Sequence, residues 1–205
     1  MKKTFQVGEG FFGEGVNAAH INTVLGRKSG PAGISFINSL ASPTIGHIPF
    51  LVVWKPNMPV SPATLFVNKS AIAGERHGEL TWGAAQAGVA HGVTEYSADR
   101  FKKIGSSDAF VLLTAVWVNP EADDEQAVYA NNRSATLAAL RQGAAVSQES
   151  KALLDFRSGG SAANPYFRRR LTRGLFTFLR EPLSQDFRDI SPCIGGSLSV
   201  RMTSM

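Results

Sequence analysis

Apolar and polar positions alternate in some stretches of the chain and recur at helical spacing in others. Five stretches have the pattern of β-strands: 5–12, 18–25, 49–54, 64–72 and 109–118. The second stretch alternates so that His20, Asn22 and Val24 share one face. The runs 49–54 and 109–118 are apolar throughout, which is typical of strands that lie deep in a sheet.

Three further stretches carry apolar residues three and four positions apart, and this spacing predicts helices. The first begins where Ser29 can cap a helix and Pro31 fits its first turn. The second spans about 79–97, and the third spans about 123–142 with acidic residues in its first turn, as the helix dipole favours. The resulting order, β-β-α-β-β-α-β-α, predicts an α+β fold, an α/β sandwich with a mixed sheet and helices on one side.

The composition changes part-way along the chain and divides it into a domain at 1–150 and a basic tail at 151–205. Residues 158–165 are rich in glycine, serine and alanine, as linkers are. Residues 1–156 contain 13 basic and 13 acidic residues, whereas 157–205 contain 8 arginines and three acids, so the formal net charge of +5 comes from the end of the chain. The charge therefore does not indicate what the domain binds.

The tail has two interpretations. Its arginines are interleaved with phenylalanine and tyrosine, a composition that can bind nucleic acid or an anionic membrane. Such a sequence is more often a solvated extension of low order, and this is what we expect here. Neither nucleic acid nor a membrane is therefore an expected partner.

The remaining composition predicts a soluble, cytoplasmic protein. The single cysteine, Cys193, excludes a disulfide framework and any zinc site built from several thiolates, and it fits a reducing compartment. The first residues contain no apolar run of signal-peptide length. No stretch approaches the ~20 apolar residues needed to span a bilayer.

Gly8, Gly10 and Gly13 match the glycine spacing of dinucleotide-binding loops. Such a loop follows a strand, opens a helix and is followed ~20 residues later by an acidic residue that binds a ribose hydroxyl. Here the next segment alternates as a strand, and no Asp or Glu occurs between Glu14 and Glu75. We therefore expect the glycines to serve a bulge, a turn or the close approach of another backbone.

His20 stands out as a polar residue in the second predicted strand. A lone histidine on a strand is most often structural or at the surface, so its spacing alone does not assign catalysis. His47, His77 and His91 show no metal-ligand spacing with it, and no metal is expected. The chain also lacks a G-x-S-x-G nucleophile elbow and a Walker loop.

Longer motifs are more specific. The chain contains, in this order, VGEGFFGEG, AAHIN, GPAGISFINSL, FLVVWKPNMPVSPATLFVNK and GAAQAGVAHGV. These motifs are collinear with those of the formaldehyde-activating enzyme family, which the chain resembles over about residues 5–145. The tail lies outside the resemblance.

The resemblance implies a fold like the second domain of ribosomal protein S5 and a ring assembly, typically a homopentamer. It also implies condensation of formaldehyde with tetrahydromethanopterin to methylenetetrahydromethanopterin and water, a lyase reaction of one-carbon metabolism and methylotrophy. Formaldehyde and the reduced pterin are both substrates, so no cofactor is expected.

The family's site residues carry over position by position. Its acid–base histidine falls on His20. Its pterin contacts fall on Asn22, Leu51, Lys69, Ala71 and Gln86. Asn22 stands where the family has aspartate and Ala71 where it has threonine, so a possible base and a hydroxyl are both missing. The alternative is a non-catalytic homologue that binds a pterin or formaldehyde with altered substrate preference.

The chemistry of these residues fits the implied reaction. A secondary amine adds to formaldehyde unaided, but the carbinolamine needs a proton to lose its hydroxyl, and an imidazole supplies one near neutral pH. We expect His20 to be this general acid. Lys69 either binds the pterin as an ammonium or attacks formaldehyde as a neutral amine with a strongly lowered pKa, and we expect the first.

Overall fold

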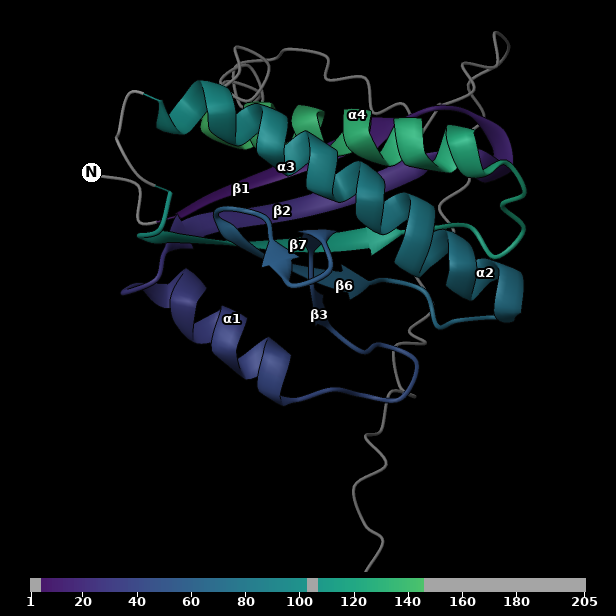
Figure 1. Ribbon diagram of the computed structural model, residues 1–205, viewed down its shortest axis with the longest axis horizontal. Coiled ribbons are helices and arrows are strands. Elements are labelled where there is room, and N and C mark those ends of the chain that lie inside the picture. Colours follow the sequence, from purple (N-terminus) through teal and green to yellow (C-terminus); the bar gives the residue numbers. More distant parts are fainter. Residues whose placement is uncertain (1–4, 103–106, 146–205) are drawn as a thin grey trace, which may run out of the picture. The chain divides into compact units, whose positions relative to one another are not determined.

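A five-stranded sheet in the order β1-β2-β7-β6-β3 forms the centre of the fold (Figure 1). The computed structural model describes residues 5–102 and 107–145. The strands of the sheet are β1 (Phe5–Phe12), β2 (Ala19–Arg27), β7 (Phe110–Trp117), β6 (Ala63–Asn68) and β3 (Phe50–Leu51). β6 and β7 are parallel and the other neighbours are antiparallel, so the predicted α+β class with a mixed sheet is confirmed.

Helices lie on both faces of this sheet. The long helices are α1 (Pro31–Ala41), α3 (Gln86–Phe101) and α4 (Glu125–Ala144). α3 and α4 cover one face, whereas α1 packs on the other face against β2 and β7 (Figure 1). The prediction that the helices share one side is therefore wrong for α1. Because α1 buries little more than Ala32 and Phe36 against the strands, it covers only part of its face.

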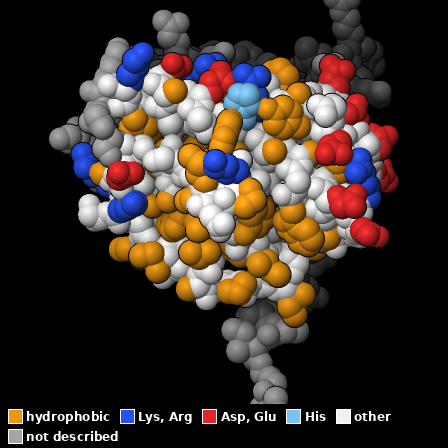
Figure 2. All heavy atoms as spheres, in the orientation of Figure 1, with side chains coloured by type: hydrophobic (Ala, Val, Ile, Leu, Met, Phe, Trp, Pro, Cys, Tyr) orange, Lys and Arg blue, Asp and Glu red, His pale blue; other side chains and the backbone are white. Residues whose placement is uncertain are grey.

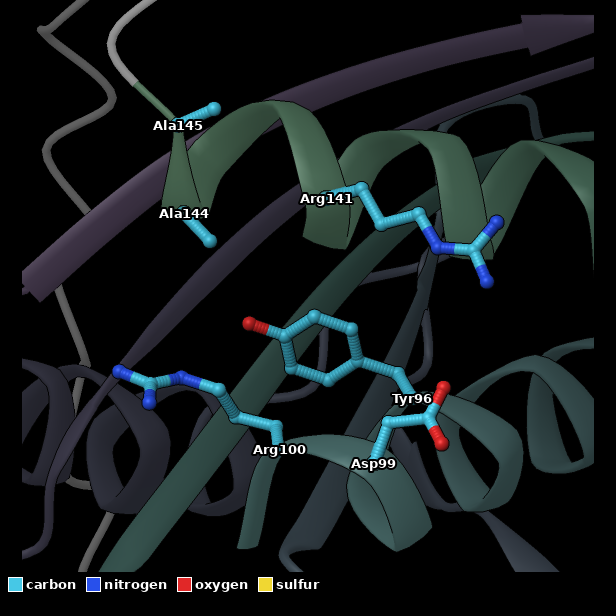
Figure 3. Close-up of a pocket in the computed structure, with 6 residues that line it drawn as sticks. All are labelled: Tyr96, Asp99, Arg100, Arg141, Ala144 and Ala145. Carbon is cyan, nitrogen blue, oxygen red and sulfur yellow. The ribbon is translucent and has the colours of Figure 1, made fainter. Parts of the chain in front are cut away.

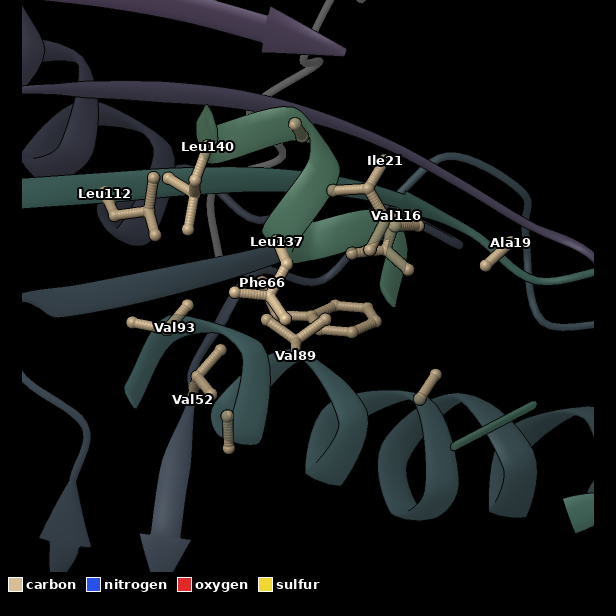
Figure 4. Packing of buried hydrophobic residues seen from close by; sticks show 14 of the residues in the cluster. Ala19, Ile21, Val52, Phe66, Val89, Val93, Leu112, Val116, Leu137 and Leu140 are labelled. Atoms are coloured by element: carbon tan, nitrogen blue, oxygen red, sulfur yellow. The ribbon is translucent and has the colours of Figure 1, made fainter. Parts of the chain in front are cut away.

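The main core fills the space between the sheet and the helices α3 and α4 (Figure 4). Its buried side chains include Ile21, Phe66, Leu112 and Val116 from the strands and Val89, Val93, Leu137 and Leu140 from the helices. Successive residues of a strand point to opposite faces. Burial of Ile21 in this core therefore directs His20 and Asn22 to the face that α1 covers in part.

Glycines allow α4 to lie directly on β1. A Cβ atom on Gly8 would be 1.8 Å from the carbonyl oxygen of Ala139, and a Cβ atom on Gly10 would be 2.0 Å from that of Ala135. The close approach of another backbone, one of the roles expected for these glycines, is confirmed. The stretch continues through the 3-10 turn η1 (Gly15–Asn17) into β2, rather than into the helix of a dinucleotide-binding loop.

Three predicted elements differ from the structure. The strand predicted at 64–72 ends at Asn68, so Lys69 and Ala71 lie beyond β6 rather than on it. The apolar run 49–54 is not a deep strand: β3 lies at the edge of the sheet, and β4 (Val53–Lys55) pairs instead with β5 (Met58–Pro59) in a small hairpin. The second helix is longer than predicted, because α2 (Glu75–Glu79) and the π-helical segment η2 (Leu80–Ala85) run directly into α3.

The predicted tail at 151–205 lies outside the described residues, so the division after residue 150 and the low order of the tail stay predictions. The expected likeness to the second domain of ribosomal protein S5 also stays a prediction. Within residues 5–102 and 107–145, no helix is long and apolar enough to cross a membrane.

Candidate active site

Three polar side chains meet on the part of the sheet that α1 leaves open. Glu9 comes from β1, His20 from β2, and Lys69 directly follows β6. The strand register brings them together, since β1 pairs with β2 and the Lys69 amide donates a hydrogen bond to the Val116 carbonyl of β7 at 2.8 Å. We call these residues the Glu9–His20–Lys69 triad.

The imidazole of His20 is held by the carboxylate of Glu9. Its Nε2 lies 2.7 Å from Glu9 Oε1. The His20 side chain is 36% exposed and that of Glu9 is 65% exposed, so a ligand from solution can reach both. The ring of Phe11 flanks His20, with 6.4 Å between the ring centroids. A proton donor must be oriented and accessible, and His20 meets both conditions.

Lys69 approaches the other nitrogen of the same ring. Its Nζ lies 3.4 Å from His20 Nδ1. Burial lowers the pKa of the Lys69 ammonium below its ordinary value, and the negative charge of Glu9 offsets part of this effect. A partly desolvated amine therefore lies beside an imidazole that a carboxylate holds in place.

The two contacts indicate which tautomer a neutral His20 adopts. A carboxylate can only accept a hydrogen bond and an ammonium can only donate one. Nε2–H of His20 therefore donates to Glu9, and the lone pair of Nδ1 faces Lys69.

Asn22 lies directly across from Glu9 in the register of β1 and β2. Its half-buried side chain makes no hydrogen bond to any other residue in the described part of the chain, so its amide is free to bind a ligand. The neutral amide also leaves Glu9 without a like charge on the position opposite.

Replacing Asn22 with aspartate is expected to destabilise the fold by about 0.2–1 kcal/mol, because like charges on directly opposed strand positions repel. Thermal unfolding at low and high salt measures the effect, which salt should reduce because both groups are partly exposed. The double variant Glu9→Gln/Asn22→Asp is the control and should unfold at the temperature of Glu9→Gln alone. Equal loss of stability in both backgrounds would contradict the assigned repulsion.

Two of the other predicted pterin contacts lie apart from His20. Leu51 is on β3, three strands away from β2, which corresponds to about 14 Å at the usual strand spacing. Gln86 begins α3 on the opposite side of the sheet, where its Oε1 accepts a hydrogen bond from the Val53 amide at 3.2 Å. Ala71 is exposed, two residues after Lys69. One chain therefore brings Asn22 and Lys69 to His20 but leaves Leu51 and Gln86 elsewhere.

The other three histidines make separate contacts. His77 is buried, with Nδ1 accepting from the Ala73 amide and Nε2 donating to the Val118 carbonyl. His47 and His91 contact a backbone carbonyl and a tyrosine hydroxyl, respectively. Among residues 5–102 and 107–145, no three His, Cys, Asp or Glu side chains are grouped to hold a metal ion. That the protein uses no metal stays a prediction.

A hollow of about 390 Å³ lies near the C-terminal ends of α3 and α4 (Figure 3). Its lining residues are Tyr96, Asp99, Arg100, Arg141, Ala144 and Ala145. It lies on the face of the sheet that α3 and α4 cover, whereas the triad lies on the face that α1 covers in part. None of the predicted site residues lines it. It is therefore not the site that the sequence predicts.

Glu9 is the site residue that the sequence analysis missed. The glycines on either side of it suggested a role for the backbone alone. Alternation along β1 holds a signal, because Gly8 and Gly10 face α4 and Glu9 must then face the other side of the sheet. Its contact with His20 also depends on the pairing of β1 with β2, which the alternation does not reveal.

The part of the chain that contains the triad is similar in sequence to known proteins. The sequence model of a family described as Formaldehyde-activating enzyme (Fae) matches residues 7–160. A relative from Archaeoglobus fulgidus named Bifunctional enzyme Fae/Hps is 34% identical over 138 residues, 67% of this chain and 35% of the relative. A Methanosarcina barkeri relative named 5,6,7,8-tetrahydromethanopterin hydro-lyase is 38% identical over 134 residues, 65% of this chain and 75% of the relative. The chain thus spans about a third of the bifunctional relative and three quarters of the hydro-lyase.

Proposed function

The chain belongs to the formaldehyde-activating enzyme family, and from that premise we propose that it condenses formaldehyde with tetrahydromethanopterin to methylenetetrahydromethanopterin and water. The relative named as a tetrahydromethanopterin hydro-lyase supports this choice of pterin. The observation that carries the proposal is His20 itself, accessible from solution and held between Glu9 and Lys69. On this proposal the protein is a lyase of one-carbon metabolism.

The proposed role of His20 is to protonate the oxygen that leaves. An amine of the pterin adds to formaldehyde, the carbinolamine loses water with a proton from His20, and the second amine closes on the iminium. The imidazolium that donates this proton is stabilised by a charge-assisted hydrogen bond to Glu9. The long contact between Nδ1 and Lys69 leaves Nδ1 as the nitrogen from which a substrate oxygen can take the proton.

Tetrahydromethanopterin enters the proposal as a co-substrate, with no further cofactor. Asn22 and Lys69 lie beside His20 and are suited to bind polar groups of the pterin near the reacting carbon. Addition and dehydration here need only a proton donor and an acceptor, which the triad supplies. We place the protein in the cytoplasm because its single cysteine fits a reducing compartment.

A homo-oligomer is part of the proposal, and a homopentamer is the form that the resemblance predicts. Leu51 and Gln86 lie away from His20, so a pocket that contains all the predicted contacts needs residues from two copies. α1 and the segment after it expose Ile34, Ile37, Leu40, Ile45 and Ile48, and apolar side chains gather over this part of the molecule in Figure 2. Light scattering at the assay concentration should give a multiple of the chain mass, and a monomer with full activity would contradict this part.

The proposed reaction is tested by mixing the protein with formaldehyde and tetrahydromethanopterin and following the methylene product above the spontaneous rate. We expect acceleration that is proportional to protein concentration. No acceleration would overturn the proposed function, and binding of the pterin without acceleration would indicate the non-catalytic alternative.

A further inference from the structure

Both imidazole nitrogens of His20 are engaged by ionisable side chains. Glu9 is 2.7 Å from Nε2 and the Lys69 Nζ is 3.4 Å from Nδ1. The geometry fits two arrangements of the same protons: an ammonium beside a neutral imidazole, or a neutral amine beside an imidazolium. They differ by one proton transfer between Nζ and Nδ1. In the second arrangement the carboxylate on Nε2 pairs with the positive charge on the ring.

We propose that Lys69 captures formaldehyde covalently, through an amine that has passed its proton to His20. The inference rests on the proposed function, since it takes formaldehyde as the substrate of the same site. It changes the order of the proposed steps, because Lys69 rather than the pterin makes the first bond to formaldehyde. It also replaces the role expected from the sequence, contact with the pterin as an ammonium, by attack as a neutral amine. Lys69 then delivers the carbon to the pterin as an electrophile that is already activated.

The bonds and protons of this step balance. The Lys69 ammonium gives a proton to Nδ1, and its lone pair forms a C–N bond to formaldehyde. A proton moves from nitrogen to oxygen, which gives the carbinolamine. The His20 imidazolium then protonates the hydroxyl, the C–O bond breaks, and water leaves a methylene-iminium on Lys69 and a neutral His20. An amine of the pterin adds to this carbon, and its proton passes to the Lys69 nitrogen. The C–N bond to Lys69 then breaks, which leaves a neutral Lys69 amine and a methylene-iminium on the pterin. The second amine of the pterin closes on this carbon, and the proton that it releases restores the Lys69 ammonium.

The position of Lys69 supports both halves of this step. Its contact with Nδ1 holds Nζ beside the proton acceptor, and the carbinolamine oxygen, two bonds from Nζ, stays near the same nitrogen. Burial also lowers the Lys69 pKa and thereby raises the fraction of neutral amine at physiological pH, with a partial offset from Glu9.

The ionisable groups around Lys69 come from three segments. His20 faces it from β2, Glu9 acts on it from β1, and His47 lies nearby with its Nδ1 2.9 Å from the Asn68 carbonyl. β7, the strand beside it, carries no ionisable side chain between Phe110 and Trp117. The described lysines Lys28, Lys55 and Lys102 are exposed, and none has a comparable contact with a histidine.

Reductive trapping tests this role without the pterin. The full chain is treated at pH 7 with a small excess of formaldehyde and cyanoborohydride, and peptide mass spectrometry locates the added methyl groups. An ordinary lysine is roughly 0.04% neutral amine at this pH, and each unit by which its pKa falls raises that fraction about tenfold. We expect Lys69 to be methylated at least tenfold faster than Lys102, with the ratio falling toward one above about pH 11, where an ordinary lysine is mostly neutral. In His20→Ala the advantage of Lys69 at pH 7 should shrink.

The matched variants are Lys69→Arg and Lys102→Arg. Both keep the positive charge, but arginine cannot form the carbinolamine at neutral pH because its guanidinium stays protonated. Lys69→Arg should lower kcat at least tenfold, whereas Lys102→Arg should not change it. Methylation of Lys69 no faster than that of Lys102, or full kcat in Lys69→Arg, overturns this inference. If the wild-type protein still accelerates the pterin reaction, the proposed function stands without it.

Discussion

Replacing His20 with alanine is expected to lower kcat/KM for the condensation by about 10²–10⁴-fold, the usual contribution of a positioned general acid. The imidazole is the group that can give a proton to the departing oxygen, and Glu9 at 2.7 Å cannot supply that proton as a carboxylate. The side chain is 36% exposed, so its removal leaves no sealed cavity and the fold should remain. Initial rates above the spontaneous reaction, with circular dichroism and thermal unfolding alongside, measure both effects.

His91→Ala is the matched control for this variant. His91 is also half-buried, but it lies on α3 and contacts the Tyr129 hydroxyl rather than the triad. Its loss should leave kcat/KM within about threefold of wild type, since the residue lies outside the Glu9–His20–Lys69 triad. A His20→Ala protein that is folded and retains more than about a tenth of wild-type kcat/KM would contradict general acid catalysis by His20.

Gly10→Ala is expected to destabilise the protein by about 1–3 kcal/mol or more, as overpacked positions do. The added methyl group would meet the Ala135 carbonyl oxygen at 2.0 Å, and this atom belongs to the backbone of α4 rather than to a flexible side chain. The strain can be relieved only if α4 moves away from β1, which also carries Glu9 and Phe11. Urea unfolding should therefore show a lower midpoint, and the condensation rate should fall as well.

Gly83→Ala provides the control for this change. Gly83 lies in the helical segment η2, and a Cβ atom there would meet no other heavy atom within 4 Å. Alanine in an open helical position is neutral or stabilises by up to about 1 kcal/mol relative to glycine. If Gly10→Ala unfolds within about 0.5 kcal/mol of wild type, as an ordinary surface substitution does, β1 and α4 are not in the contact described.

The face of the sheet on which the site lies follows largely from the alternation of residues along one strand. Alternation in the second predicted strand sets His20 and Asn22 on the face away from Ile21, and the structure buries Ile21 and leaves the other two accessible to a ligand. The motifs that resemble the formaldehyde-activating enzymes correctly indicated the family. The prediction that the apolar run 49–54 is a deep strand was wrong. An apolar composition does not distinguish a central strand from an edge strand, and at this edge Leu51 is 40% exposed.

From the amino-acid order alone one can derive the α+β class, the strand that carries His20 and the face on which it lies, because a two-residue repeat is a local property of the backbone. Three features could not be derived in this way: the approach of Glu9 and Lys69 to one imidazole, the packing of α1 on the second face, and the separation of Leu51 and Gln86 from His20. They depend on strand order and register between segments far apart in the chain. Those pairings depend on which combination of helices and strands buries the most apolar surface, and that is a property of the whole fold.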